Sequence, residues 1–387
     1  MPDAVIVATA RTPIGRAYKG SLVDVRADDL AGFAIDAVMK KVPAVDRASV
    51  EDVMLGCGLT HHEQGLNVAR PASLLGGMPD TVPATTVNRF CASSLQTIRM
   101  AYHAITRGEG HTYVAAGTES VTRTYGRALD PEDFNPRFTD PGRDDFINYV
   151  YIPMGNTAEN VAKRHGITRE RQDEFAKRSQ DRAVEAQKNG FFEREITPIE
   201  LPDGRVIADD DGPRPNTTLE KLAELPPVFD PEGTVTAGNS CPLNDGAAAV
   251  LVMSADRAAE LGVEPLARIV ASSVAGLEPE YMGLGPVPAV RKVLAQTGMT
   301  LDDIDLIELN EAFAAQVLAC VDQLGIDIDK LNPHGGAIAL GHPFGMTGAR
   351  IMGTLLNGLQ TMDATYGLET MCVGGGQGMA MIVERLV

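Results

Sequence analysis

The sequence is short of positive charge. Its 34 lysine and arginine residues stand against 52 aspartate and glutamate residues, which gives a formal net charge of −18 at pH 7 with neutral histidines. Because binding to a nucleic-acid backbone requires a basic surface, we do not expect a nucleic-acid partner. A small phosphorylated ligand is still compatible with this composition, since it needs only a local cluster of cations.

Long apolar runs and paired cysteines are also lacking. No stretch approaches the roughly 18–20 apolar residues that a membrane-spanning helix needs, and the first residues indicate an acidic turn and a short strand instead of a secretion signal. The five cysteines are odd in number and contain no C-x-x-C pair, lying at positions 57, 91, 241, 320 and 372. We therefore expect a cytoplasmic protein without membrane insertion and without a metal site.

Alternating elements indicate an α/β chain. With 387 residues and 44% hydrophobic content, the chain is long enough for a large core and two or three domain-sized units. Short apolar runs predict buried strands at residues 4–8, 112–116, 248–253, 304–309 and 379–383. Apolar residues at helical spacing follow Cys91 and Asn310. Residues 122–244, rich in Pro, Arg and Asp, predict an inserted subdomain near the surface with one well-formed helix at about 169–189.

Two cysteines stand where a reactive thiol is expected, and a glycine-rich histidine segment lies between them. Cys91 follows a polar turn and directly precedes a helical pattern, and a helix N-terminus favours a thiolate. Cys372 precedes four glycines between positions 374 and 378, which suit backbone N–H groups directed at an oxyanion. His342, between Gly341 and Pro343, is a candidate general base. These residues point to carbon–carbon bond chemistry on a thioester.

Each of these residues also has an ordinary structural interpretation. A free cysteine is usually a small buried hydrophobe, and His342 alternatively caps a turn. Asn310 is either the N-cap of the next helix or directs its amide to a ligand at the carboxyl edge of the sheet. The glycine-rich loop after Cys372 also resembles a phosphate-binding loop, but the helix that should follow in a dinucleotide fingerprint is missing.

Taken together and in this order, the motifs resemble those of the thiolase family of acyl-CoA acyltransferases, nearly from end to end. The motifs are Asn-x-x-Cys-x-Ser at 88–93, Met-Gly-x-Thr-Ala-Glu at 154–159, Thr-Ala-Gly-Asn at 236–239, Asn-Asp-Gly-Ala-Ala at 244–248, Asn-Glu-Ala-Phe at 310–313, Gly-Gly-Ala-Ile-Ala-Leu-Gly-His-Pro at 335–343 and Cys-x-Gly-Gly-Gly-x-Gly at 372–378. Each motif is modest evidence alone, whereas the ordered set is very specific.

The resemblance implies a duplicated, five-layered αβαβα core with an inserted loop domain that covers CoA. By this pattern, residues 1–121 and 245–266 form the N-terminal thiolase half, residues 122–244 the cover domain, and residues 267–387 the C-terminal half. The resemblance also implies a homodimer or homotetramer. It allows a β-oxidation multienzyme complex as a further partner.

The resemblance further implies a catalytic role for each candidate. His342 deprotonates Cys91, which attacks the keto carbon of a 3-ketoacyl-CoA, and Cys372 protonates the departing acetyl-CoA enolate. Free CoA then takes the acyl group from Cys91, so ping-pong kinetics are expected. One oxyanion site uses His342 with a water held by Asn310, and the other uses the N–H groups of Cys91 and Gly374. CoA is a co-substrate, and no metal or prosthetic group is implied.

A second set of residues matches positions that contact CoA in the family. They are Met154, Arg214, Ser240, Cys241, Ala312 and Phe313. Arg214 matches a contact to the nucleotide end, whereas Met154, Ala312 and Phe313 match the pantetheine and acyl path.

Two positions depart from the family pattern. Many members have a serine where this chain has Cys241, and a thiol is a much weaker hydrogen-bond partner than a hydroxyl. Ser240, one residue earlier, is the alternative partner for the pantetheine arm. In place of the usual asparagine, His334 adds a titratable group near the site.

The residues before Met154 favour a degradative enzyme. Short-chain biosynthetic members commonly have His directly before Met-Gly, whereas this chain has Ile152 and Pro153. We therefore expect CoA-dependent cleavage of a 3-ketoacyl-CoA to acetyl-CoA and a shortened acyl-CoA in β-oxidation-type catabolism. The alternatives are an acetoacetyl-CoA thiolase, which catalyses the Claisen condensation, and a non-catalytic acyl-CoA-binding protein of thiolase shape. A decarboxylating ketoacyl synthase is disfavoured, because such enzymes have His or Asn in place of Cys372.

Overall fold

The computed structural model describes residues 2–124 and 133–387. In chain order the strands are β1 (Ala4–Arg11), β2 (Gly15–Arg16), β3 (Asp52–Gly56), β4 (Ala84–Val87), β5 (Thr112–Ser120), β6 (Ile199–Glu200), β7 (Val206–Ile207), β8 (Asn244–Ser254), β9 (Ala267–Gly276), β10 (Leu306–Leu309), β11 (Tyr366–Val373) and β12 (Gln377–Arg385). The helices are α1 (Ala27–Lys41), α2 (Ala69–Leu75), α3 (Ser93–Arg107), α4 (Val121–Thr124), α5 (Met154–His165), α6 (Arg169–Lys188), α7 (Leu219–Ala223), α8 (Ala255–Glu260), α9 (Pro286–Thr297), α10 (Ala314–Leu324), α11 (Ala337–Leu340) and α12 (Thr347–Thr361).

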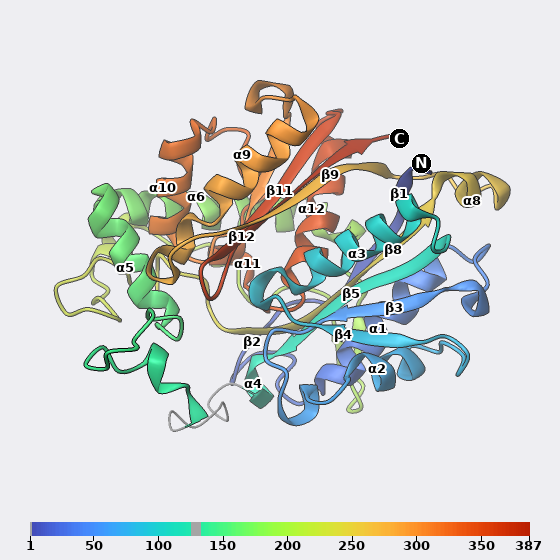
Figure 1. Ribbon diagram of the computed structural model, residues 1–387, viewed down its shortest axis with the longest axis horizontal. Coiled ribbons are helices and arrows are strands. Elements are labelled where there is room, and N and C mark those ends of the chain that lie inside the picture. The colour runs from blue at the N-terminus through green and yellow to red at the C-terminus, as the bar shows by residue number, and fades with distance from the viewer. Residues whose placement is uncertain (1, 125–132) are drawn as a thin grey trace.

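One mixed sheet runs through the molecule, and a narrow seam divides it into two halves (Figure 1). The strand order is β10-β11-β12-β9-β1-β8-β5-β3-β4, with β2 paired to β8. β1 pairs with β8 along its whole length but with β9 only at Val5 and Ile6. The five-layered architecture implied by the resemblance has two sheet layers. In this chain the two layers are joined into one sheet, because β1 and β9 pair at their ends over a short distance.

Three hydrophobic clusters define five layers. The first packs α1 and α2 on β3, β5 and β8, and the second packs α3 and α12 between the two halves of the sheet. The third packs α9 and α10 on β10, β11 and β12. In Figure 1 the outer helices accordingly lie at opposite sides of the molecule, with α3 and α12 between them. The five-layered αβαβα fold predicted for the chain is confirmed.

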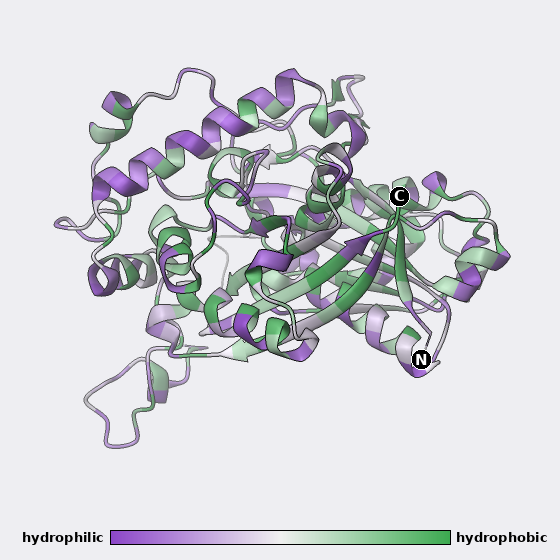
Figure 2. Cartoon of the chain, turned by 90° about the horizontal axis from the view of Figure 1, so that it is seen from above, coloured by the Kyte–Doolittle hydropathy of each residue, from purple (hydrophilic) through white to green (hydrophobic). Residues whose placement is uncertain are grey.

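The predicted elements recur with small shifts at their ends. The five predicted strands are β1, β5, β8, β10 and β12, and the predicted long helix is α6. β10 starts at Leu306 because residues Leu301–Asp303 form a 3-10 turn, in which Thr300 and Asp303 make a capping box. Figure 2 shows the central strands largely in green, whereas purple residues gather on the helices and loops around them.

The region predicted as a cover subdomain holds more helix than the sequence indicated. Besides α6 it contains α5 and the short α7. The prediction of a single helix was wrong because α5 buries mainly small residues, among them Ala158 and Ala162, which leave a weak periodic signal. Among the described residues, no helix is long and apolar enough to cross a membrane.

Candidate active site

Cys91 lies in a short 3-10 turn, Phe90–Ala92, immediately before α3. The turn is held by its neighbours: Phe90 donates its N–H to Asn88 Oδ1 (2.8 Å), and the Ser93 hydroxyl donates to the Phe90 carbonyl (2.6 Å). Phe90 has φ +44°, an uncommon value for a non-glycine residue. The predicted place of Cys91 before a helix N-terminus is confirmed, and a strained turn presents it.

Two backbone N–H groups point at the Cys91 sulfur. Burial raises the pKa of the thiol to about 12, while the N–H groups of Gly374 and of Cys91 itself act in the opposite direction by binding the thiolate. These are the two donors that the resemblance implied for an oxyanion site. In the ligand-free chain the thiol is therefore protonated, with donors already in place for a negative charge.

His342 is fixed by an unusual backbone turn. It follows α11 and Gly341, whose φ of +115° is disfavoured for residues with a side chain. A Cβ atom on Gly341 would also lie 2.6 Å from the Asn244 side chain. Asn244 Oδ1 in turn accepts the His342 backbone N–H at 3.0 Å. His342 is 1% exposed. The glycine-rich turn predicted from the sequence therefore holds a buried histidine.

Hydrogen bonds select one tautomer of His342. The Thr347 hydroxyl donates to the Pro343 carbonyl (2.8 Å), so its oxygen is left to accept from His342 Nδ1 at 2.6 Å. Nε2 is then unprotonated, and it accepts a hydrogen bond from Asn310 Nδ2 at 3.3 Å. Burial lowers the His342 pKa to about 3, and the Arg350 guanidinium acts in the same direction. The imidazole is neutral and carries its lone pair on Nε2, as a general base requires.

Asn310 connects the end of β10 to this histidine. Its backbone N–H donates to the Thr370 carbonyl of β11 at 3.0 Å. Since α10 begins at Ala314 with Phe313 at its N-cap position, Asn310 does not cap the helix. Its buried Oδ1 has no hydrogen-bond partner among the described residues. Of the two interpretations, the structure favours an amide directed into the site.

Cys372 lies near the end of β11 in apolar surroundings. It packs with Ala158, Val235, Met282, Ala312 and Phe313. Burial raises its pKa well above the ordinary value, and negative charge on Cys91, Cys320 or Cys241 acts in the same direction. Cys372 is therefore a protonated thiol, a suitable state for donating a proton to carbon.

The residues matched to the CoA path lie next to Cys372, with one exception. Met154, the first residue of α5, packs on the same apolar cluster. Ser240 forms a β-bridge with Phe313, and the Cys241 N–H donates to the Ala312 carbonyl at 3.0 Å. The exception is Arg214, an exposed loop residue whose backbone N–H donates to Gln180 of α6 (2.8 Å).

The contacts of Ser240 and His334 bear on the two departures from the family pattern. The Ser240 hydroxyl already donates to the Thr236 carbonyl at 2.6 Å, so it offers a ligand only its acceptor lone pair. His334 stacks on Phe191 with ring centroids 3.7 Å apart. Burial lowers the His334 pKa to about 4, with Arg194 and Arg182 acting in the same direction. His334 is therefore uncharged at neutral pH.

Two functional candidates had no distinct signal in the sequence. Thr347 fixes the His342 tautomer, and Asn244 holds the His342 backbone. Asn244 lies in one of the family motifs, but the motif alone does not indicate what its side chain does. Thr347 follows His342 by five residues, a spacing that predicts no contact. Within residues 2–124 and 133–387, no group of three or more His, Cys, Asp or Glu side chains could hold a metal ion.

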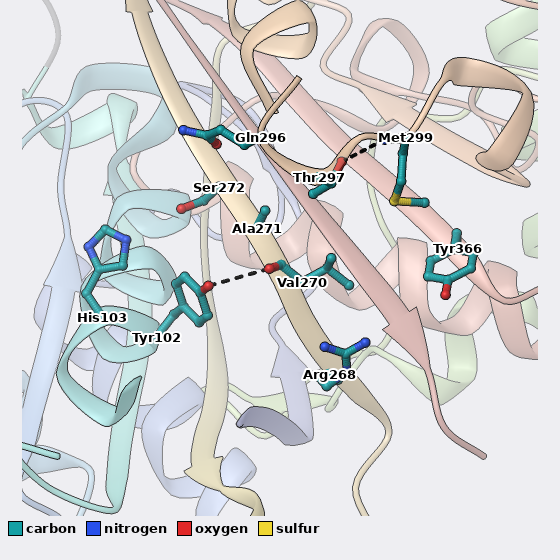
Figure 3. Close-up of a pocket in the computed structure, with 10 residues that line it drawn as sticks. All are labelled: Tyr102, His103, Arg268, Val270, Ala271, Ser272, Gln296, Thr297, Met299 and Tyr366. Carbon is teal, nitrogen blue, oxygen red and sulfur yellow. Dashed lines mark hydrogen bonds between the residues drawn. The ribbon is translucent and has the colours of Figure 1, made fainter. Parts of the chain in front are cut away.

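A separate open pocket of about 670 Å³ lies between α3, β9 and the end of α9 (Figure 3). Its lining residues are Tyr102, His103, Arg268, Val270, Ala271, Ser272, Gln296, Thr297, Met299 and Tyr366. Tyr102 closes one side by donating its hydroxyl to the Val270 carbonyl at 3.4 Å. None of the predicted site residues lines this pocket, so the catalytic candidates form a different site.

Comparisons with known proteins cover the whole chain. Residues 4–256 match the thiolase N-terminal domain, and residues 263–385 match the thiolase C-terminal domain. The chain is 48% identical to a beta-ketoadipyl-CoA thiolase of Acinetobacter baylyi and 48% identical to a 3-ketoacyl-CoA thiolase of Aeromonas hydrophila, in both cases over 100% of each protein. The dimeric peroxisomal thiolase of Saccharomyces cerevisiae superposes with a TM-score of 0.93 at 40% identity, covering 100% of this chain and 98% of that one.

These full-length matches agree with the ordered motifs and with the five-layered fold. The chain belongs to the thiolase family and is an acyltransferase.

Proposed function

We propose that the protein is a degradative 3-ketoacyl-CoA thiolase that transfers an acyl group through Cys91 to CoA. The observation that carries this proposal is a neutral His342, whose Nε2 is unprotonated and faces the Asn310 amide, together with two thiols in different surroundings. Cys91 has N–H donors at its sulfur, whereas Cys372 is enclosed by apolar side chains. Those surroundings suit a nucleophile and a carbon acid, respectively.

The first half-reaction forms an acyl-enzyme. The Cys91 S–H proton passes to His342 Nε2 while the sulfur attacks the C3 carbonyl, so that negative charge moves onto an oxygen. Because burial keeps both groups neutral in the free chain, we infer that the proton moves only as the substrate takes up the charge. The C2–C3 bond then breaks, its electron pair goes to C2, and Cys372 donates its proton there to give acetyl-CoA.

The second half-reaction returns both thiols to their starting state. The Cys372 thiolate takes the proton of incoming CoA, and the CoA sulfur attacks the acyl-Cys91 thioester. In the proposed mechanism the N–H groups of Cys91 and Gly374, which act on the Cys91 sulfur, stabilise the resulting oxyanion, a contribution of about 3 kcal/mol per donor in comparable sites. Protonated His342 then returns its proton to Cys91 as the shortened acyl-CoA leaves.

We infer the substrate class from the side chains around Cys372. The apolar ones are Ala158, Val235, Met282, Ala312 and Phe313, and Met154 adjoins them. An apolar acyl chain fits such walls, whereas the carboxylate of a 3-ketodicarboxylic acyl chain would require a cation to balance its buried charge. The 48% identity to a beta-ketoadipyl-CoA thiolase makes that dicarboxylic substrate the second candidate.

A thiolysis panel tests the substrate class. We expect 3-ketoacyl-CoA esters with unsubstituted chains of six or more carbons to have kcat/KM values at least tenfold above that of beta-ketoadipyl-CoA. Strict preference for acetoacetyl-CoA would refute the degradative assignment, and preference for beta-ketoadipyl-CoA would establish the second candidate. Intact-protein mass spectrometry tests the chemistry, because a non-catalytic binding protein would show no acyl adduct on Cys91.

We infer that CoA binds without a resident metal or prosthetic group, with its nucleotide end toward Arg214 and its pantetheine arm along Ser240 and Cys241. Arg16 lies close enough to Arg214 to disfavour its charge, which makes a small basic site in an acidic protein. We further infer a cytoplasmic enzyme that works as a homodimer or homotetramer. A β-oxidation multienzyme partner stays a prediction.

A further inference from the structure

Arg350 is a buried cation without a direct partner. It lies on α12, is 1% exposed, and none of its three guanidinium nitrogens has a hydrogen-bond partner among the described residues. An arginine in that state would be strongly destabilising if it met only apolar groups. Polar groups near it must therefore balance its charge.

Two carboxyl groups face Arg350 from neighbouring strands. On β10, Leu306 belongs to the central cluster while Ile307 and Leu309 belong to the outer one, so alternation turns Glu308 toward the central layer, where α12 lies. The same alternation on β11 turns Glu369 that way. The two glutamates are paired in register on these parallel strands.

The two carboxyl groups are as poorly partnered as the arginine. Both oxygens of Glu369 and Oε1 of Glu308 are buried without a hydrogen-bond partner in the described part of the chain. Opposite charges that face each other beyond hydrogen-bond distance are commonly bridged by ordered water, which makes about three hydrogen bonds per molecule in such sites. A polar site of this kind has the donors and acceptors that water needs.

Most of the remaining charges near Arg350 are paired with each other. Arg11 of β1 pairs with Glu195 and with Asp210, each at 2.8 Å. Thr354 of α12 also donates to Glu195 at 3.1 Å, but Glu195 Oε1 is buried without a partner among the described residues. The other charged groups that influence the cluster are Arg182 of α6 and Glu311 after β10. The charge of Arg350 is therefore left to Glu308 and Glu369, with Glu195 as a third carboxyl group nearby.

Arg350 lies about one helical turn after Thr347, the residue that binds the His342 ring. Thr347 and Arg350 are three residues apart at the start of α12 and so share one face of the helix. Thr347 holds Nδ1 of His342, and the turn that carries Cys91 also contacts α12. The other groups at the imidazole are the uncharged side chains of Asn310, Asn244 and Phe344.

We propose that Arg350 is a positioning residue, whose charge, buried beside Glu308 and Glu369, adds to the effect of burial in keeping His342 in its neutral, proton-accepting form. This inference rests on the proposed thiolytic function of the same site. A positive charge one helical turn away disfavours the imidazolium. His342 thus stays available at every pH at which the enzyme works, and it returns its proton readily once the acyl-enzyme breaks down.

The two glutamates are not equivalent to fixed negative charges. Burial raises the pKa of Glu308 to about 8 and raises that of Glu369 well above its usual range. Burial therefore favours the protonated form of both carboxyl groups, and Arg350 carries the positive charge of the trio in acidic solution. Glutamine is then a close substitute at either position in acidic solution.

The test is the acidic limb of the kcat/KM profile for thiolysis, measured by pH jump from neutral stocks. Neutral His342 is the active form and a lowered pKa keeps it neutral, so removing the cation raises that pKa and moves the limb to higher pH. For Arg350→Met we expect a shift of about one pH unit, with a loss of activity that grows as the pH falls. Arg350→Lys should restore the wild-type limb, and Glu308→Gln and Glu369→Gln should leave it unmoved.

Two outcomes separate this inference from the proposed function. A wild-type enzyme without thiolysis refutes the function itself, whereas wild-type thiolysis with an unmoved limb in Arg350→Met refutes only the role of Arg350. If Arg350→Met fails to fold, the triple variant R350M/E308Q/E369Q replaces it, since neutralising a whole buried ion cluster is often tolerated. An unmoved limb in the triple variant is equally decisive against the proposal.

Discussion

At the scale of the residue, the same functional group has different chemistry in different surroundings. The thiol of Cys91 meets two N–H donors, whereas the thiol of Cys372 meets apolar side chains. Sequence reasoning identified both cysteines through their neighbours in the chain. It could not identify Thr347 or Arg350, because their partners on His342 and on β10 and β11 come together only when the layers pack.

Replacing Cys372 should separate the two half-reactions. For Cys372→Ala we expect Cys91 still to accept an acyl group from an acyl-CoA, because the nucleophile, base and oxyanion donors are untouched. Thiolysis of a 3-ketoacyl-CoA should fall by about 10²–10⁴-fold, since the carbon acid is missing. Mass spectrometry and steady-state rates check the two halves. Wild-type turnover would remove Cys372 from the mechanism.

Thr347 should act through the tautomer of His342. In Thr347→Val the Nδ1–H loses its acceptor, so the free lone pair is no longer confined to Nε2. We expect kcat to fall by roughly 10–100-fold with little change in KM, as is usual when the partner of a catalytic histidine is removed. Thr347→Ser keeps the hydroxyl and is the matched control. Equal loss in both variants would contradict this role.

At the scale of the element, five strands and the helix α6 were predicted, whereas the long strands β9 and β11 were missed because polar residues interrupt their apolar runs. The apolar runs at β1, β5 and β8 are long and uninterrupted, whereas β4 is partly exposed and gave no signal. The turn at Cys91 was predictable from its polar residues before a helix. The strand order was not, because an apolar run does not reveal which layer will cover it.

The turn before His342 should be sensitive to a single methyl group. In Gly341→Ala the φ of +115° and the 2.6 Å approach to Asn244 force the backbone to shift, and His342 moves with it. We expect a loss of roughly 2–4 kcal/mol in the free energy of unfolding together with a large loss of kcat. Thermal unfolding and steady-state assays provide the measurement.

Gly108→Ala is the matched control for this turn. Gly108 also has a positive φ, +75°, but nothing lies within 4 Å of its Cβ position. We expect a cost of about 1 kcal/mol from the backbone alone, with unchanged kcat. A comparable loss of activity in both variants would show that strain, not the placement of His342, is responsible.

At the scale of the whole molecule, the site is assembled from both halves. Cys91 comes from the N-terminal half, whereas Asn310, His342 and Cys372 come from the C-terminal half. The domain limits proposed from the sequence stay a prediction, although the two family matches change over at residues 256–263, close to the proposed limit at 266.

The edge of the sheet predicts where two copies meet. β4 ends the sheet, and Leu66 beside it is fully exposed at 103%. An unpaired edge next to exposed apolar residues is a common interface. We expect wild-type protein to have twice the 41.1 kDa chain mass in light scattering, and Leu66→Glu to shift toward a single chain. Met362→Glu, at an exposed site elsewhere, is the control, and an unchanged mass in Leu66→Glu would exclude this edge.

The narrow seam between β1 and β9 affects how the enzyme loses activity on heating. Because β1 pairs with β9 only at Val5 and Ile6 in the described part of the chain, the relative placement of the two halves depends largely on the packing of α3 against α12. Mild heating or denaturant should loosen that packing before either half melts. Catalysis would then disappear while most secondary structure persists, so the temperature of inactivation would lie below the temperature of unfolding.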